Sequence, residues 1–169
     1  PLTVTSNPNA KFDISLVNDV TITAGEGMST TGNAIQHVNA GSAMTDVVYT
    51  AADGYYFPTD YGTSVSSNGV NVKRDSYSQV TVYGTPAADT TITLPAATEK
   101  TKETTPTTAT FTAEGYNIGT LSGVDNTMKY RVGDDDIWHD ISGNSVPLGS
   151  LIPVSLEIVK KGGDTTLDS

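Results

Sequence analysis

Short runs in which apolar and polar residues alternate recur along the whole chain, and turn-forming residues interrupt nearly all of them. A period of two is typical of half-buried β-strands, and frequent Gly, Pro, Asn and Asp argue against long helices. The pattern therefore predicts an all-β fold made of many short strands. The clearest expected strands cover residues 11–23, 45–50, 70–73, 77–83 and 90–94.

Two parts of this pattern leave alternatives open. Residues 11–23 predict either two strands or one bent strand, with the break at Asn18-Asp19. Residues 25–42 fit a short helical turn and an irregular strand equally well. The tight turns are clearer, because Asp53-Gly54 and Asn68-Gly69 are dipeptides that readily accept a positive φ.

Residues 96–108 interrupt the apolar pattern, because they contain Thr, Glu, Lys and Pro but no large apolar side chain. This composition predicts an extended linker. We therefore expect a leader over residues 1–10, a first module over 11–95, the linker over 96–108, and a smaller second module over 109–169. Strands spaced by 8–12 residues in both modules predict two tandem β-sandwiches. The single Trp138 is the expected core residue of the second module, which we expect to be truncated at its C-terminus.

Composition narrows the class of protein. The chain of 169 residues has 27 threonines, no cysteine and a formal net charge of −10. The negative charge disfavours nucleic acid and anionic membrane surfaces as partners, and no apolar run approaches the roughly 20 residues that span a bilayer. The absence of cysteine excludes thiolate catalysis and a disulfide framework. Acidic, threonine-rich, cysteine-free β proteins are common among exported bacterial modules.

The run TDVVYTAADGYYFPTDY and the following SSNGVNVKRDSYSQVTVYGTPAADTTITLP resemble an immunoglobulin-like repeat of multi-domain surface proteins from Firmicutes-type bacteria. GTLSGVDNTMKYRVGDDDIWHDISG and LEIVKKGGDTTLDS are similar to a companion module of fibronectin type III character. The resemblance covers residues 44–169 and implies two Ig-like or fibronectin-like sandwiches. Members of this group serve mostly as spacers or non-catalytic accessories.

The expected function is therefore a non-catalytic spacer at the bacterial cell surface, with neighbouring domains of the same polypeptide as its partners. One alternative is an adhesin module that binds a glycan or a host surface. Another is a decoration or fibre domain of a bacteriophage virion, which would form a homo-oligomer or dock on a capsid. The sequence does not choose among these partners.

Aromatic side chains supply the candidate binding residues. Six of the eight tyrosines lie within residues 47–95, and tyrosine rings can stack on sugars. Residues 55–57 form an expected strand in which side chains alternate between two faces, so at least one face must belong to the core. Packing is therefore the first interpretation of these rings, and sugar stacking is the second. The candidate ligand-binding residues are Tyr55, Tyr56, Tyr61 and Tyr77.

Four carboxylates within seven residues supply the candidate metal site. Asp134, Asp135, Asp136 and Asp140 lie in the segment VGDDDIWHD, and Ca²⁺ binds six to eight oxygen ligands. The segment lacks the D-x-[DN]-x-[DN]-G pattern of the best-known calcium loop, so a solvated hairpin tip is the competing interpretation. We expect no other cofactor.

No arrangement of residues predicts catalysis. His37 and His139 fall in different expected modules, and GTSVS at residues 62–66 lacks the second glycine of a nucleophile elbow. A pair of carboxylates in a cleft could still serve glycoside hydrolysis, but a small sandwich rarely forms such a cleft. We therefore expect a protein that is not an enzyme.

Overall fold

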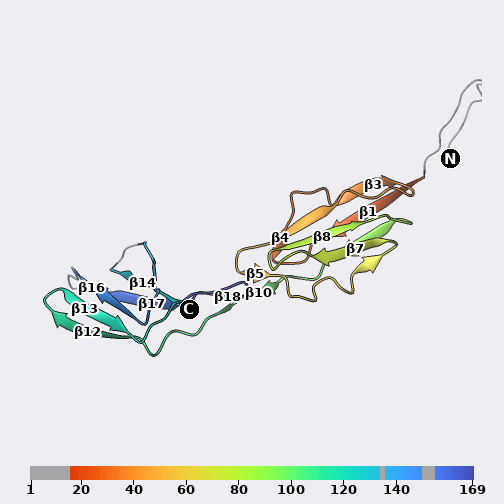
Figure 1. Cartoon of the computed structure of the whole chain (residues 1–169). Helices are drawn as coiled ribbons and strands as arrows, with labels where there is room; N and C mark the ends of the chain where they lie inside the picture. The colour runs from red at the N-terminus through yellow and green to blue at the C-terminus, as the bar shows by residue number, and fades with distance from the viewer. Residues whose placement is uncertain (1–15, 134–135, 150–154) are drawn as a thin grey trace, which may run out of the picture. The chain divides into compact units, whose positions relative to one another are not determined.

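The structure is a computed structural model that describes residues 16–133, 136–149 and 155–169. These residues form eighteen strands and no helix, which confirms the prediction of an all-β protein (Figure 1). The chain divides into two compact units. The first unit contains residues 16–52 and 57–97, and the second unit contains residues 53–56 and 98–169.

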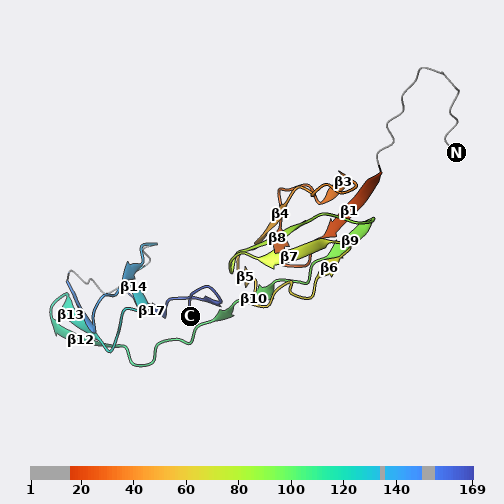
Figure 2. The ribbon, with the colours of Figure 1, turned by 45° about the vertical axis from the view of Figure 1, so that its right-hand side comes forward.

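The first unit contains two sheets. In the smaller sheet the central strand β1 pairs antiparallel with β3 and parallel with β9, and Figure 2 shows β9 beside β1. In the larger sheet all neighbours are antiparallel, in the order β2-β4-β8-β7-β6. The strands are β1 (Val17–Thr23), β2 (Met28–Ser29), β3 (Ile35–Asn39), β4 (Val47–Ala51), β6 (Ser66–Ser67), β7 (Val70–Arg74), β8 (Gln79–Gly84) and β9 (Thr90–Thr93).

The alternation seen in the sequence determines which side chains of the first unit are buried. Val47 and Tyr49 of β4 are buried while Val48 between them is exposed, as the period of a strand requires. Val80 and Val82 lie directly opposite them on β8 and are fully buried. The expected strands at 45–50, 70–73, 77–83 and 90–94 are confirmed with small shifts of their ends.

Strand pairing decides the structure of the two segments for which the sequence left alternatives, residues 11–23 and 25–42. Strand β1 continues through Asn18 and Asp19, so the expected break there is wrong. Asn18 lies opposite Val38 and Asp19 lies opposite His37, and this pairing with β3 keeps the strand extended. Residues 25–42 contain β2 and β3 rather than a helical turn.

The Asn68-Gly69 turn joins β6 to β7 as predicted. Asn68 has φ 47° and Gly69 has φ 84°, both in the left-handed region that these residues tolerate best. A Cβ added at Gly69 would stand 2.3 Å from the carbonyl oxygen of Thr85. Glycine is therefore required at this position both for its conformation and for its small size.

The second unit contains two three-stranded antiparallel sheets, ordered β12-β13-β16 and β15-β14-β17. It also contains two two-stranded sheets: β10 pairs with β5, and β11 pairs parallel with β18. The strands are β5 (Tyr55–Tyr56), β10 (Thr98–Glu99), β11 (Thr101–Lys102), β12 (Thr110–Gly115), β13 (Ile118–Ser122), β14 (Met128–Val132), β15 (His139–Asp140), β16 (Ser145–Leu148), β17 (Leu156–Lys160) and β18 (Thr166–Leu167).

Both three-stranded sheets contribute to one core in the second unit. Leu121 of β13 is fully buried, and Met128 of β14 and Leu148 of β16 are nearly so. Trp138 is only half-buried and does not belong to this core cluster, so its expected role as the core residue is wrong. The smaller apolar residues Val124 and Ile141 fill the core instead, together with Leu121, Met128 and Leu148.

Residues 96–108, the expected linker, contain strands β10 and β11. Residues 53–56 form the turn and the strand β5 with which β10 pairs. The chain therefore passes between the two units at three places, which are Ala52-Asp53, Tyr56-Phe57 and Ala97-Thr98. Among the described residues no helix is long and apolar enough to cross a membrane.

Candidate functional site

Tyr61 is a packing residue in this structure. Its ring centroid lies 4.7 Å from that of Phe57, and only 5% of the residue is exposed. The hydroxyl donates a 2.5 Å hydrogen bond to the carbonyl oxygen of Pro95, and burial raises its pKa to about 12. A buried ring offers no face for stacking on a sugar. The hydrogen bond to Pro95 instead connects the segment after β5 to the residues that follow β9.

The other three candidate tyrosines are half-buried and divided between the units. Tyr55 and Tyr56 form β5 in the second unit, where the hydroxyl of Tyr55 donates to the carboxylate of Glu99 at 3.2 Å. Tyr77 belongs to the first unit, and the guanidinium of Arg74 lies 4.2 Å from its ring centroid. The Tyr55 hydroxyl and the Tyr77 ring thus have contacts within the chain, and the role of all three tyrosines in binding stays a prediction.

Only part of the acidic segment can be placed. Asp134 and Asp135 lie outside the described residues. Asp136 and Asp140 are exposed, and the Asp140 carboxylate forms an ion pair with Lys161 Nζ at 3.2 Å. Among residues 16–133, 136–149 and 155–169, no three His, Asp or Glu side chains are grouped closely enough to hold a metal ion. The calcium site stays a prediction that depends on the two aspartates not described.

The two histidines have different surroundings. His37 Nδ1 lies 2.6 Å from the carboxylate of Asp19 on the exposed surface of the first unit. His139 belongs to the second unit and stacks on Tyr130 with ring centroids 5.2 Å apart. Each histidine has a partner within its own unit.

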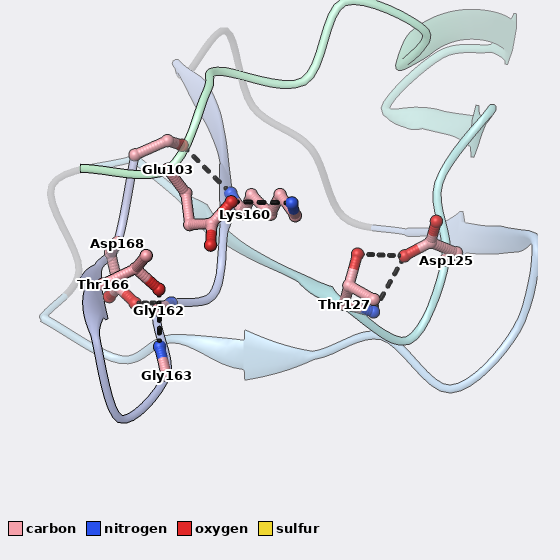
Figure 3. Close-up of polar contacts among 9 residues, drawn as sticks. Glu103, Asp125, Thr127, Lys160, Gly162, Gly163, Thr166 and Asp168 are labelled. Carbon is pink, nitrogen blue, oxygen red and sulfur yellow. Dashed lines mark hydrogen bonds and ion pairs between the residues drawn. The ribbon is translucent and has the colours of Figure 1, made fainter. Parts of the chain in front are cut away.

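A polar network surrounds Glu103, Lys160 and Asp168, and the sequence did not predict it (Figure 3). Glu103 directly follows β11, and its carboxylate accepts a 2.6 Å bond from Lys160 Nζ at the end of β17. The side chain of Thr166 in β18 also donates to it. These bonds hold the pKa of Glu103 below its usual value.

The carboxylate of Asp168 makes the second junction of this network. It accepts a 2.8 Å bond from the backbone N–H of Gly162 and forms an ion pair with Lys129 of β14. Both contacts favour the charged form, so the pKa of Asp168 is lowered. Ser169 adds two bonds, because its N–H donates to the carbonyl of Lys160 and its hydroxyl accepts from the Lys160 N–H.

Trp138 lies against the two basic side chains of β14. Lys129 Nζ and Arg131 Cζ are each 5.0 Å from its ring centroid, and Arg131 Nε also donates to Glu157 at 2.6 Å. Lys129 and Arg131 share one face of the strand because they are two residues apart. The sequence signal for this face is the alternation of basic and apolar residues in MKYRV.

The network connects segments that are distant in sequence. Its carboxylates accept bonds from ammonium groups, hydroxyls and backbone N–H groups, and these contacts fix the connecting strand β11, the hairpin around β18 and the sheet β15-β14-β17 to one another. What this arrangement supplies chemically is a set of charge-assisted hydrogen bonds.

Comparisons with known proteins add no relative to this picture. No family model matches the chain. No curated protein and no solved structure matches it either.

Proposed function

We propose that the chain is a non-catalytic structural module of an exported bacterial surface protein, in which two sandwich-like units space or present neighbouring domains. The sheets β12-β13-β16 and β15-β14-β17 share one core, which supports a sandwich interpretation of the second unit. The parallel pairing of β1 with β9 and the five-stranded sheet support the same interpretation of the first unit.

The observation that carries the proposal is the way in which residues 98–103 are held. Strand β10 pairs with β5, the Lys100 N–H donates to the carbonyl of Gly54 at 2.7 Å, and β11 pairs with β18. The carboxylate of Glu103 then accepts from Lys160. A spacer needs ordered segments, and these contacts hold residues 98–103 within the second unit.

NMR relaxation of the backbone amides tests this stiffness. We expect order parameters of about 0.85 for residues 98–103, as in the strands, whereas a flexible linker falls below about 0.6. The variant Glu103→Gln should lower the order parameters of residues 101–103, because it removes the charge that pairs with Lys160. Glu114→Gln is the matched control, since Glu114 is exposed on β12 and accepts a hydrogen bond from the neutral hydroxyl of Thr120.

The same protein samples distinguish the alternative functions. Glycan-array retention that disappears in Tyr55→Ala or Tyr77→Ala would replace the spacer proposal with a binding module. A stable homo-oligomer in sedimentation experiments would favour the virion domain. Flexible amides at residues 98–103 in the unmodified chain would contradict the spacer proposal directly.

A further inference from the structure

The outer edge of β17 has backbone hydrogen-bonding groups that no described residue satisfies. Strand β17 pairs with β14 on one side, and no other strand of the described residues pairs along Leu156–Val159. The edge is therefore open over the part of the chain that the structure describes. An open edge in a sheet is a ready template for another strand.

The hydrogen bonds at the ends of β17 show which residues face this edge. The Lys161 N–H donates to the carbonyl of Thr127, and the carbonyl of Ser155 accepts from the Gly133 N–H. The backbone N–H and C=O groups of the odd-numbered residues of β17 therefore face β14. The backbone groups of Lys160 face the outer edge, because both its N–H and its carbonyl bond to Ser169. By alternation the N–H and C=O of Leu156 and Ile158 also face away from β14.

Ser169 occupies the C-terminal end of this edge. It meets Lys160 across the outer edge, with the Ser169 N–H bonded to the Lys160 carbonyl at 3.1 Å. Beyond that pair the edge continues unpaired through Ile158 and Leu156. The side chains of Leu156 and Ile158 pack on the core of the second unit but are only half-buried, as expected where one side of a sheet is uncovered.

The negative charge of Glu157 indicates which kind of strand could pair with the outer edge of β17. Glu157 lies between the two edge-facing residues and points to the opposite face of the strand, where Arg131 contacts it. Pairing of β17 with β17 of a second copy, centred on this residue, would place two Glu157 carboxylates opposite each other, which is unfavourable in a chain of net charge −10. A basic residue opposite Glu157 would instead be favourable.

We propose that the outer edge of β17 binds an extended strand of a separate partner protein, added antiparallel, in which a basic residue stands between two apolar residues. The apolar side chains extend the row formed by Leu156 and Ile158, and the basic side chain meets Glu157. Backbone hydrogen bonds to Leu156 and Ile158 supply the affinity. The apolar contacts on one face of the strand and the contact with Glu157 on the other face supply the selectivity. This interaction goes beyond the spacer proposal and does not depend on it.

Amide hydrogen exchange of the full chain without any ligand is the first test. Glu157 and Val159 should exchange slowly, because their N–H groups bond to β14, and Leu156 and Ile158 should exchange much faster. Slow exchange at all four amides would mean that this chain already covers the edge, which overturns the proposal. Protection of Leu156 and Ile158 that rises with protein concentration would indicate self-pairing and would also overturn it.

Titration with the peptide acetyl-Thr-Val-Lys-Val-Thr-amide is the second test. Four backbone hydrogen bonds predict a dissociation constant on the order of 1 mM, with the largest shifts at the amides of Leu156 and Ile158. A peptide N-methylated at both valines should not bind, whereas one N-methylated at the lysine should bind normally. Absence of binding by the unmodified peptide, or binding that ignores valine methylation, would refute strand addition.

Variants of the protein test the chemistry of the partner. Glu157→Lys should weaken binding of the lysine peptide about tenfold, and the peptide with Glu in place of Lys should then bind better than the original. Glu114→Lys makes the same charge change on the other sheet and should leave the affinity unchanged. Equal losses in both variants would show that only net charge matters, which contradicts a contact at Glu157.

Discussion

The two units bury their side chains to different extents. Of the eleven largest fully buried side chains in the described residues, ten belong to the first unit and only Leu121 belongs to the second. Within the described part of the chain, the second unit contains the ion pairs Lys160–Glu103, Lys129–Asp168, Arg131–Glu157 and Lys161–Asp140, whereas the first unit contains His37–Asp19 and Lys73–Asp75. We infer that the first unit is held mainly by its apolar core, and that the second unit relies in addition on charged groups around a smaller core.

The largest effect should come from the core of the first unit. Phe57 is fully buried and packs on Tyr61, so Phe57→Ala removes a large side chain and leaves a cavity. We expect the free energy of unfolding of the first unit to fall by about 3–5 kcal/mol. Hydrogen exchange measured separately for each unit gives this number, since a single melting temperature is poorly defined for a chain of two units. A loss below 1 kcal/mol would contradict a tightly packed core.

Leu121→Ala is the corresponding change in the second unit. A cost of about 2–4 kcal/mol is expected from the burial of the side chain. Because no other large side chain among the described residues of this unit is buried as fully, we expect the whole unit to lose its protection from exchange while the first unit keeps its own. Retained protection in β13 and β14 would show that the charged groups alone hold the second unit together.

High pH should destabilise the first unit through Tyr61. Its folded pKa of about 12 is higher than the unfolded value near 10, so the folded state keeps its proton over a pH range in which the unfolded state loses it. Stability is therefore fully present below pH 10 and decreases by about 2–3 kcal/mol as the pH rises to 12. Unfolding measured over this range in Tyr61→Phe should show a smaller slope, and an unchanged slope would exclude Tyr61 as its source.

Low pH and high salt should destabilise the second unit more than the first unit. Among the described carboxyl groups, those of Glu103, Asp125 and Asp168 in the second unit have lowered pKa values, compared with Asp75 in the first unit. Stability from these groups is present above the unfolded carboxyl pKa near 4 and is lost as the pH falls through the lower folded values. Chemical denaturation at pH 7 and pH 3 should show the larger loss in the second unit, and an equal loss in both units would contradict the comparison.

The smallest change tests a single ion pair. Asp168→Asn keeps an acceptor for Gly162 but removes the charge that pairs with Lys129. Because the Asp168 side chain is 46% exposed, solvent screens much of this interaction, and we expect a loss of about 0.2–1 kcal/mol. Raising the salt concentration should destabilise the original chain toward the level of the variant. Salt that affects both chains equally would exclude a contribution from this pair.

The sequence predicts strands best where their own side chains carry the signal. Alternation of apolar and polar residues predicts β4, β7, β8 and β9, and the prediction of the Asn68-Gly69 turn is correct because φ preferences act locally. Strands β10 and β11 were missed because TE and TK bury nothing and exist only through partners about forty and sixty-five residues away. Local composition contains no trace of such pairings.

The candidate sites were harder to predict for a related reason. Tyrosine supplies both a core ring and a binding ring, so only the burial of Tyr61 identifies its role. Trp138 is expected in the core as the single tryptophan of the second module, but it is half-buried and lies against Lys129 and Arg131 of β14. Glu103 was not recognised because its partners Lys160 and Thr166 are distant in sequence and become neighbours only in the fold.

The three chain crossings between the units have a consequence for how the modules can be exchanged. A recombination junction at Ala97-Thr98 would appear natural from sequence, but it would separate β10 from β5 and leave the backbone groups of Tyr55 and Tyr56 without their strand partner. Either half transferred alone would thus carry an unsatisfied strand into its new context. We expect the pair to be inherited and swapped as one cassette, with residues 53–56 always accompanying the second unit.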